Sequence, residues 1–116
     1  MLTSGILLAA GRAARMGTDK LRLPHQGRRL IDCALAPLMD CRLIDEVIVV
    51  VRPGFNLLGD DPKCRFVVNP DHREGMGSSL RTGVAAASAA ANALVVSLAD
   101  LPELTSELVT TLIEAF

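Results

Sequence analysis

The chain has 116 residues, half of them apolar, and a formal net charge of −1 at pH 7. This length suits one domain with a hydrophobic core and is too short for two ordinary domains. The balanced charge argues against a protein that binds nucleic acid by neutralising phosphates, and the scarcity of aromatic residues (three Phe, no Tyr or Trp) argues against base stacking.

Two further classes of protein are disfavoured. No apolar run approaches the about 20 residues of a membrane helix, and no basic stretch precedes the apolar N-terminus as it does in a signal peptide. Cys33, Cys41 and Cys64 have no C-x-x-C spacing, so neither a zinc site nor a disulfide framework is expected. We therefore expect a soluble cytoplasmic domain with reduced thiols and no membrane contact.

The N-terminal part begins with a strand and continues to a helix. Residues 5–10 form an apolar run that ends at Gly11, which is typical of a central strand in a parallel sheet. After a polar loop, Gln26-Gly27 indicates a turn. Apolar residues then recur at helical spacing over 29–39, and we expect Pro37 to kink this helix or to end it one residue earlier.

Three further strands and two helices are predicted in the rest of the chain. The strands are expected at 46–51, which is mostly β-branched, at the short segment 65–68, and at 94–98, which is short and apolar. The helices are expected at 78–91 and from residue 105 to Phe116. Ser78 or Ser79 would cap the first of them, and Thr105 or Ser106 the second. Their apolar faces would consist of Leu80, Val84 and Ala87, and of Leu108, Leu112 and Ile113.

This alternation of strands and helices predicts an α/β fold with a mainly parallel sheet that has helices on both faces. In such sheets, ligands bind outside the carboxyl ends of the strands. Gly11, Asn69 and Asp100 each lie at or just past the end of a predicted strand. The sequence therefore places three polar or glycine-rich segments at one edge of the sheet.

The segment that follows the first strand reads L-A-A-G-x3-R-M-G-x2-K and begins at Leu8. Small residues let backbone amides approach an anion, while arginine and lysine supply positive charge. The pattern is neither the P-loop nor the dinucleotide-binding fingerprint. A phosphate site is one interpretation, and an exposed loop with incidental basic residues is the other. The residues concerned are Leu8, Ala9, Ala10, Gly11, Arg12, Arg15, Gly17 and Lys20.

Two later segments carry polar groups to the same edge. Asp100, in Leu98-Ala99-Asp100-Leu101-Pro102, offers the hard oxygen ligand that Mg²⁺ prefers, or it simply begins a turn before proline. Gly75-Met76-Gly77-Ser78-Ser79-Leu80 follows Asn69-Pro70 and opens a helix. Its amides and hydroxyls could bind an anion or a base edge, with simple helix capping as the alternative.

These three segments, in this order and at this spacing, closely resemble the motifs of the MobA-like nucleotidyltransferases. The Ala-Ala-Gly form is similar to the molybdenum cofactor cytidylyltransferase branch. The resemblance implies a Rossmann-like, GT-A-type three-layer sandwich, catalytic roles for Arg15, Lys20 and Asp100, and Mg²⁺ on Asp100. It also implies nucleotide binding by Leu8, Ala9, Ala10, Gly11, Arg12, Gly17, Asn69, Gly77, Ser78 and Ser79, among which Arg12 holds a position that varies in the family.

The activity that the resemblance implies is transfer of CMP from CTP to the terminal phosphate of molybdopterin, with release of pyrophosphate. A molybdoenzyme or its chaperone would be the partner protein. Asn69 offers both a donor and an acceptor, which suits cytosine, whereas guanylyltransferase relatives have an acidic residue near this place. Asn-Pro is also a strong turn former, which is the alternative for Asn69.

The chain departs from the family in length, because family members are usually considerably longer. We expect residues 1–116 to form one domain, the nucleotide-binding portion, without the C-terminal part that supplies the acceptor pocket and a second metal-binding Asp. Two alternatives to the cytidylyl reaction stay open. One is a related transferase that acts on a sugar phosphate or a methylerythritol phosphate, and the other is a catalytically silent nucleotide-binding module.

Overall fold

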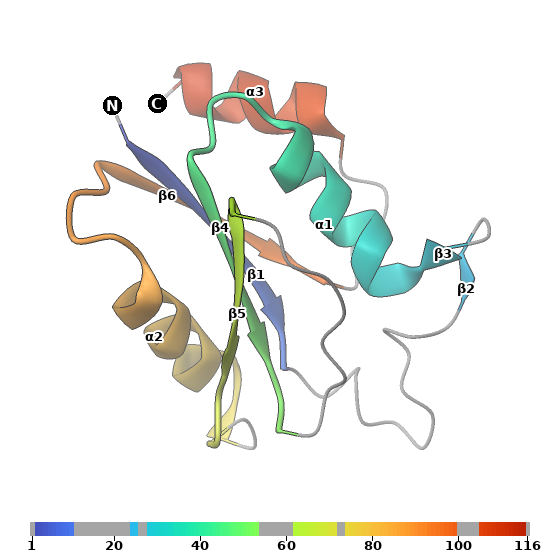
Figure 1. The fold of residues 1–116 in the computed structure, drawn as a ribbon, viewed down its shortest axis with the longest axis vertical. Coiled ribbons are helices and arrows are strands. Elements are labelled where there is room, and N and C mark those ends of the chain that lie inside the picture. Colours follow the sequence, from blue (N-terminus) through green and yellow to red (C-terminus); the bar gives the residue numbers. More distant parts are fainter. Residues whose placement is uncertain are drawn as a thin grey trace.

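The computed structural model describes residues 2–10, 24–25, 28–53, 62–71, 74–99 and 105–115. Its centre is a parallel sheet with the strand order β5-β4-β1-β6, and helices lie on both faces of the sheet (Figure 1). The predicted Rossmann-like α/β architecture is therefore confirmed. The strands are β1 (Thr3–Ala9), β4 (Glu46–Val51), β5 (Cys64–Val68) and β6 (Ala93–Leu98).

The two central strands separate two apolar layers. Alternate residues of a strand point to opposite faces, and both faces of β1 and β4 are covered. Leu7 and Val49 pair in register and pack on one side, whereas Ile6 and Ile48 pack on the other. Burial on both faces explains why these two strands are continuous apolar runs and do not alternate between apolar and polar residues.

One face of the sheet carries α1 (Leu30–Asp40) and α3 (Ser106–Ala115), and the opposite face carries α2 (Met76–Ala86) (Figure 1). The predicted early end of α1 at Ala36 was wrong, because the helix continues through Pro37 to Asp40. Pro37 and Leu38 are both buried. Their burial offsets the one backbone hydrogen bond that a proline cannot make.

A distant lysine caps α1, which has no basic residue in its own last turn. The Lys63 ammonium donates to the carbonyl oxygens of Met39, at 2.8 Å, and Cys41, at 2.9 Å. Carbonyl groups at a helix C-terminus lack partners within the helix and carry partial negative charge, so a cation stabilises them. Lys63 directly precedes β5, and the contact therefore links α1 to the start of that strand.

The predicted start and cap of α2 were wrong. The helix begins at Met76, and its N-cap is Gly75, which makes no side-chain capping bond. Gly75 has φ of 104°, a conformation that side-chain-bearing residues rarely adopt. This turn places Ser78 and Ser79 inside the helix, where both side chains are buried. The positive φ at Gly75 is thus the reason why neither serine is the cap.

The end and packing face of α2 also differ from the prediction. The helix ends at Ala86, and the next residues turn toward Glu46, whose carboxylate accepts a hydrogen bond from the Ser88 amide. Leu80 and Val84 are exposed, whereas Gly83 is buried with the two serines. Small residues on the buried face let the helix backbone approach the sheet closely.

The last helix confirms one predicted cap. Thr105 Oγ1 accepts a hydrogen bond from the Leu108 amide at 3.2 Å, as an N-cap side chain does at the third helical position. The described helix ends at Ala115. The predicted last residue, Phe116, lies outside the described residues. Its buried side chains are Val109 and Ile113, and the prediction was therefore right for Ile113 only.

A two-stranded antiparallel sheet precedes α1. It consists of β2 (Pro24–His25) and β3 (Arg28–Arg29), which flank the predicted turn. All three cysteines fall within the described ranges, and none of them forms a disulfide. In the same ranges, we find no helix that is long and apolar enough to cross a membrane.

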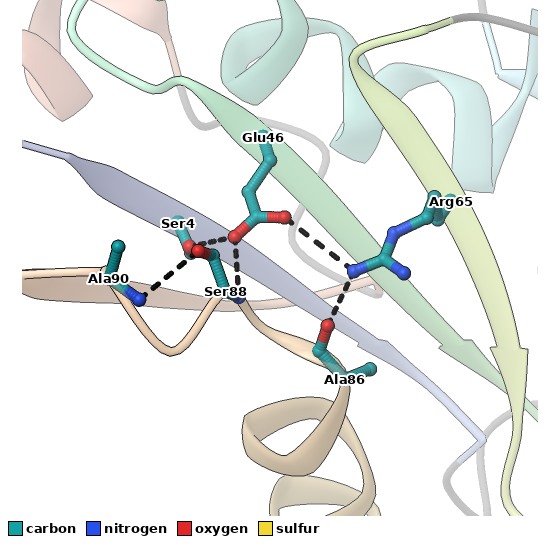
Figure 2. A network of polar contacts seen from close by, with 6 residues as sticks. All are labelled: Ser4, Glu46, Arg65, Ala86, Ser88 and Ala90. Atoms are coloured by element: carbon teal, nitrogen blue, oxygen red, sulfur yellow. Dashed lines mark hydrogen bonds and ion pairs between the residues drawn. The ribbon is translucent and has the colours of Figure 1, made fainter.

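The amino ends of the strands are joined by a polar network around Glu46 (Figure 2). Ser4 Oγ donates to Glu46 Oε2 at 2.5 Å, and the Ser88 amide donates to the same oxygen at 2.8 Å. Arg65 Nη2 lies 3.6 Å from Glu46 Oε1 and also donates to the Ala86 carbonyl. The network thus joins β1, β4 and β5 to the segment that follows α2.

Substitution of Glu46 by Gln should make the stability of the domain less dependent on acid pH. The hydrogen bond from Ser4, then that from the Ser88 amide and the charge of Arg65, hold the pKa of Glu46 below its ordinary value, although burial opposes them. A carboxyl whose folded pKa is lowered stabilises the fold above its unfolded pKa, about 4.3, and this stability is lost as the pH falls through the folded pKa. We expect Glu46→Gln to lower the free energy of unfolding by about 1 kcal/mol at pH 7.

Urea unfolding of both proteins at several pH values measures this effect. The difference between wild type and variant should shrink as the pH falls below about 4. A difference that stays constant from pH 7 to pH 3 would contradict the assignment of the lowered pKa to Glu46.

Candidate functional site

The carboxyl ends of all four strands meet at one edge of the sheet. The Ala99 amide donates to the Leu8 carbonyl at 3.0 Å, which extends the pairing of β6 with β1 by one residue. The Asn69 amide donates to the Val51 carbonyl at 2.9 Å and extends the pairing of β5 with β4. The described residues that lead into the three predicted segments, Ala10, Asn69 and Ala99, therefore lie at the same edge of the sheet.

The end of β1 contains the first three predicted nucleotide-binding residues. Leu8, Ala9 and Ala10 are buried, with exposed fractions of 7%, 2% and 0%. Leu8 and Ala10 pack in the layer under α2, and Ala9 packs in the opposite layer. Any contact that these residues make with a nucleotide would therefore come from the backbone at the end of the strand.

Six of the predicted site residues lie outside the described residues, and their roles stay predictions. Two of them directly follow a described residue just past a strand end, since Gly11 comes after Ala10 and Asp100 comes after Ala99. The six residues are Gly11, Arg12, Arg15, Gly17, Lys20 and Asp100.

Asn69 joins the end of β5 to the beginning of α2. Its Nδ2 donates to the hydroxyl oxygens of Ser78 and Ser79, both at 3.0 Å. The exposed fractions of the three residues are 1%, 6% and 3%. The structure thus brings together three of the residues that the sequence assigned to nucleotide binding, and we call them the Asn69 cluster.

The acceptor side of the Asn69 amide is also occupied. Its Oδ1 accepts a hydrogen bond from the Asp71 amide at 3.0 Å, and Ser78 Oγ lies 3.3 Å away from it. Ser78 Oγ also lies within 3.2 Å of the Asp71 carbonyl oxygen, to which it can donate. A primary amide has two N–H donors and one oxygen acceptor, and here all of them have partners within the protein.

The N-terminus of α2 faces solvent beside this cluster. Met76 and Gly77 are exposed, and Gly75 contributes no side chain that could accept hydrogen bonds from the first amides. The first amides of a helix lack partners within the helix and carry partial positive charge, which favours an anion or a carbonyl group of a ligand. Gly77 is the predicted site residue at this position.

Sequence reasoning missed one cation near this helix end. Arg81 is exposed, and a Cβ built on Gly77 would lie 3.6 Å from Arg81 Nη1. Residues four positions apart on a helix are neighbours on one face, so the spacing of Gly77 and Arg81 could have revealed the arrangement. Arg81 adds positive charge to the N-terminal end of α2, where backbone amides of the helix could bind a ligand.

A metal site formed by several protein side chains is absent from the described residues. Within these ranges, no three His, Cys, Asp or Glu side chains are placed to hold one ion. The predicted ligand, Asp100, follows Ala99 at the carboxyl edge but lies outside the described residues. A single carboxylate at such an edge suits Mg²⁺, which takes one or two protein carboxylates together with phosphate oxygens and water.

Comparison with known proteins decides the family. The model of the MobA-like NTP transferase domain matches residues 5–116. The chain belongs to this family. The resemblance to the MobA-like nucleotidyltransferases, which the sequence motifs indicated, is therefore confirmed over residues 5–116, and the MobA-like assignment agrees with the parallel sheet.

Two curated relatives of the chain have names that refer to different reactions. The chain is 34% identical over 105 residues to the molybdenum cofactor guanylyltransferase of Xanthomonas euvesicatoria, covering 90% of this chain and 50% of the relative. It is 36% identical over 107 residues to the nicotine blue oxidoreductase of Paenarthrobacter nicotinovorans, covering 87% of this chain and 50% of the relative. The chain thus spans about half the length of the curated relatives that it matches, and family membership does not by itself select CTP as the substrate.

Two solved structures have the same fold. Rv0371c of Mycobacterium tuberculosis superposes with a TM-score of 0.81 and 25% identity, covering 98% of this chain and 59% of that protein. The 4-diphosphocytidyl-2C-methyl-D-erythritol synthase of Anaerococcus prevotii gives a TM-score of 0.81 and 25% identity, covering 98% of this chain and 50% of the synthase. The described fold is therefore shared with two larger proteins, one of which is a 4-diphosphocytidyl-2C-methyl-D-erythritol synthase.

Proposed function

We propose that this MobA-like chain binds a nucleoside triphosphate at the carboxyl edge of its sheet, as the nucleotide-binding part of a nucleotidyltransferase. The observation that carries the proposal is the convergence of the ends of β1, β5 and β6 with the N-terminus of α2. In an open parallel sheet this is where ligands bind, and exposed helix amides add a preference for anions.

The reaction that we propose is transfer of a nucleoside monophosphate to a phosphate acceptor. An acceptor phosphate oxygen forms a bond to the α-phosphorus of the triphosphate. The bond from this phosphorus to the bridging oxygen of the β-phosphate breaks, and pyrophosphate leaves with the electron pair. No covalent intermediate with the protein is needed, so the protein acts by positioning and by charge stabilisation.

The residues of the chain have separate roles in this scheme. The backbone after Ala10 would hold the phosphates through the glycine loop that begins at Gly11. Arg15 would contact phosphate oxygens through a planar guanidinium, and Lys20 would act as a mobile positive charge. Both cations would stabilise the negative charge that develops on the leaving pyrophosphate.

Asp100 is the residue that would hold a divalent cation. One structure of the fold neighbour Rv0371c is a complex with manganese. We propose Mg²⁺ for this chain, because a single carboxylate and phosphate oxygens form the donor set that Mg²⁺ prefers. When bound, the ion would neutralise phosphate charge, and the remaining contributions come from the protein groups named above.

We propose CTP as the triphosphate and molybdopterin as the acceptor. The Ala9-Ala10-Gly11 form of the first motif supports CTP, because it is similar to the cytidylyltransferase branch of the family. A molybdoenzyme or its chaperone would then receive the product. GTP is the main competing substrate, since the relative from Xanthomonas is a guanylyltransferase. A methylerythritol phosphate is an alternative acceptor, supported by the fold that the chain shares with the 4-diphosphocytidyl-2C-methyl-D-erythritol synthase of A. prevotii.

A second candidate function is a nucleotide-binding module without turnover. The described residues at the carboxyl edge support nucleotide binding, whereas the three residues with proposed catalytic roles, Arg15, Lys20 and Asp100, lie outside the described residues. The two functions make the same prediction for nucleotide binding and differ only in whether pyrophosphate is released.

Calorimetric titration of the purified chain with CTP and with GTP, each with and without Mg²⁺, tests the proposal. We expect binding of CTP that requires Mg²⁺ and is at least about tenfold tighter than binding of GTP, a difference of roughly 1.4 kcal/mol. Tighter binding of GTP would show that GTP, and not CTP, is the substrate, and would leave the proposed site unchanged. Failure of both nucleotides to bind in the presence of Mg²⁺ would contradict the proposed function. Pyrophosphate release with molybdopterin present then distinguishes the transferase from the silent module.

A further inference from the structure

The side chain of Asn69 uses all of its hydrogen-bonding groups inside the protein. Both N–H donors of the amide contact hydroxyls, those of Ser78 and Ser79, and the oxygen accepts from the Asp71 amide. The side chain is 1% exposed. A group that reads a base must present an N–H or an oxygen to that base, and in this arrangement the Asn69 amide has none to present.

The Asn69 cluster places three polar side chains in the protein interior, where apolar side chains would need no hydrogen-bond partners. Three of the six buried polar side chains described in the structure, Asn69, Ser78 and Ser79, belong to it. Burial of a polar group costs free energy unless its hydrogen bonds are made, and a fully satisfied network fixes geometry. The cluster therefore fixes how the first turns of α2 lie relative to the end of β5.

The geometry of the neighbouring turn supports this role. Gly75 precedes α2 with φ of 104°, and nothing lies within 4 Å of a Cβ built there. The chain thus enters α2 through a conformation that only glycine adopts easily, while no side-chain cap holds the first turn. The hydrogen bonds from Asn69 tie this turn to the end of β5.

We propose that Asn69 is a positioning residue for nucleotide binding. It holds Ser78, Ser79 and the first amides of α2 at the carboxyl edge, and it does not read the base. This inference rests on the proposed function, because it concerns the same nucleotide site. It replaces the hypothesis that an asparagine at this position selects cytosine through its donor and acceptor.

The two roles predict different effects on base preference. A positioning residue acts through groups that every nucleotide contacts, so its loss weakens CTP and GTP binding by the same factor. A base-reading residue contacts one base better than the other, so its loss changes the ratio of the two dissociation constants. The ratio therefore separates positioning from direct reading.

The test compares wild type, Asn69→Ala, Ser79→Ala and the double variant by titration with CTP and with GTP in the presence of Mg²⁺. We expect Asn69→Ala to raise both dissociation constants roughly tenfold, with their ratio unchanged within about twofold. The double variant should bind no more than about twofold more weakly than Asn69→Ala alone, because both substitutions remove the same contact.

A matched control separates positioning from general loss of stability. Glu46→Gln weakens the network at the amino ends of the strands, at the opposite edge of the sheet, and should lower the midpoint of urea unfolding while leaving both dissociation constants unchanged. All titrations are made at a temperature at which unfolding measurements show each variant to be folded.

Three results would overturn the inference. They are a change of tenfold or more in the CTP to GTP ratio in Asn69→Ala, unchanged binding of both nucleotides in that variant, and losses that multiply in the double variant. Failure of the proposed function has a different signature, because the wild-type chain itself would then bind neither nucleotide.

Discussion

Substitution of Gly83 by alanine should destabilise the domain by about 2 kcal/mol, although alanine favours helices more than glycine does. A Cβ at this position would lie 2.7 Å from Ile6 Cγ2 and 3.1 Å from Val50 Cγ2. Ile6 and Val50 are both fully buried in the two central strands, so neither can move without disturbing the core. The helix would have to shift away from the sheet, and its packing against both strands would weaken.

The matched control for this prediction is Gly77→Ala in the same helix. A Cβ on Gly77 would meet only Arg81 Nη1, at 3.6 Å, which is ordinary van der Waals contact. The helix propensity of alanine should then raise the free energy of unfolding by up to about 1 kcal/mol. Urea unfolding followed by circular dichroism measures both variants, and the two substitutions should have opposite signs. Similar effects at both positions would contradict the close packing of α2 on the sheet.

Substitution of Lys20 by alanine should raise the dissociation constant for the triphosphate about tenfold to a hundredfold. A charge-assisted contact to a phosphate contributes about 1.5–3 kcal/mol, and backbone amides cannot supply a full positive charge. The dissociation constant should also depend less on salt concentration in the variant than in wild type, because one phosphate contact is lost. Titration at two salt concentrations measures both effects.

Lys63→Met is the matched control, because it removes one positive charge from the chain, as Lys20→Ala does. Lys63 contacts the carbonyl groups of Met39 and Cys41 at the end of α1 and precedes β5 at the amino edge of the sheet. Its loss should reduce stability by about 1 kcal/mol and leave nucleotide affinity unchanged. Equal weakening of nucleotide binding in both variants would show that only the net charge matters, and would contradict a specific role for Lys20.

The two central strands were predictable because each one contains a continuous apolar run. The run that ends at Ala10 and the β-branched segment over 46–51 became neighbouring central strands, as burial on both faces requires. Because the strands were expected to be parallel, the sequence alone was enough to predict that the motif residues lie at one edge of the sheet. The predicted location of the site depends only on these strand ends.

The boundaries and faces of the helices were less predictable. Ser78 and Ser79 have the residue type of a helix cap, but the positive φ at Gly75 lets the helix begin earlier and turns both hydroxyls inward. Leu80 and Val84 have the spacing of a buried face, yet the close approach at Gly83 selects the face of small residues instead. Both outcomes depend on contacts with the sheet, which local sequence patterns do not contain.

The contacts of charged residues were the least predictable. Lys63 caps a helix that ends more than twenty residues earlier, and Glu46 joins residues that are 42 positions away in either direction, Ser4 and Ser88. Nothing in the local sequence around these residues distinguishes them from other surface charges. Their roles became visible only when the topology brought the strand ends and helix ends together.

The central claim is that a nucleoside triphosphate binds at the carboxyl edge of the sheet. The most direct test is titration of the ¹⁵N-labelled chain with CTP and Mg²⁺, followed by amide chemical shifts in NMR spectra. We predict the largest shifts at the end of β1, at Asn69, in the first turn of α2 and at Ala99. Large shifts confined to Ser4, Glu46 and Ser88 at the opposite edge, or no shifts at saturating CTP, would contradict the claim.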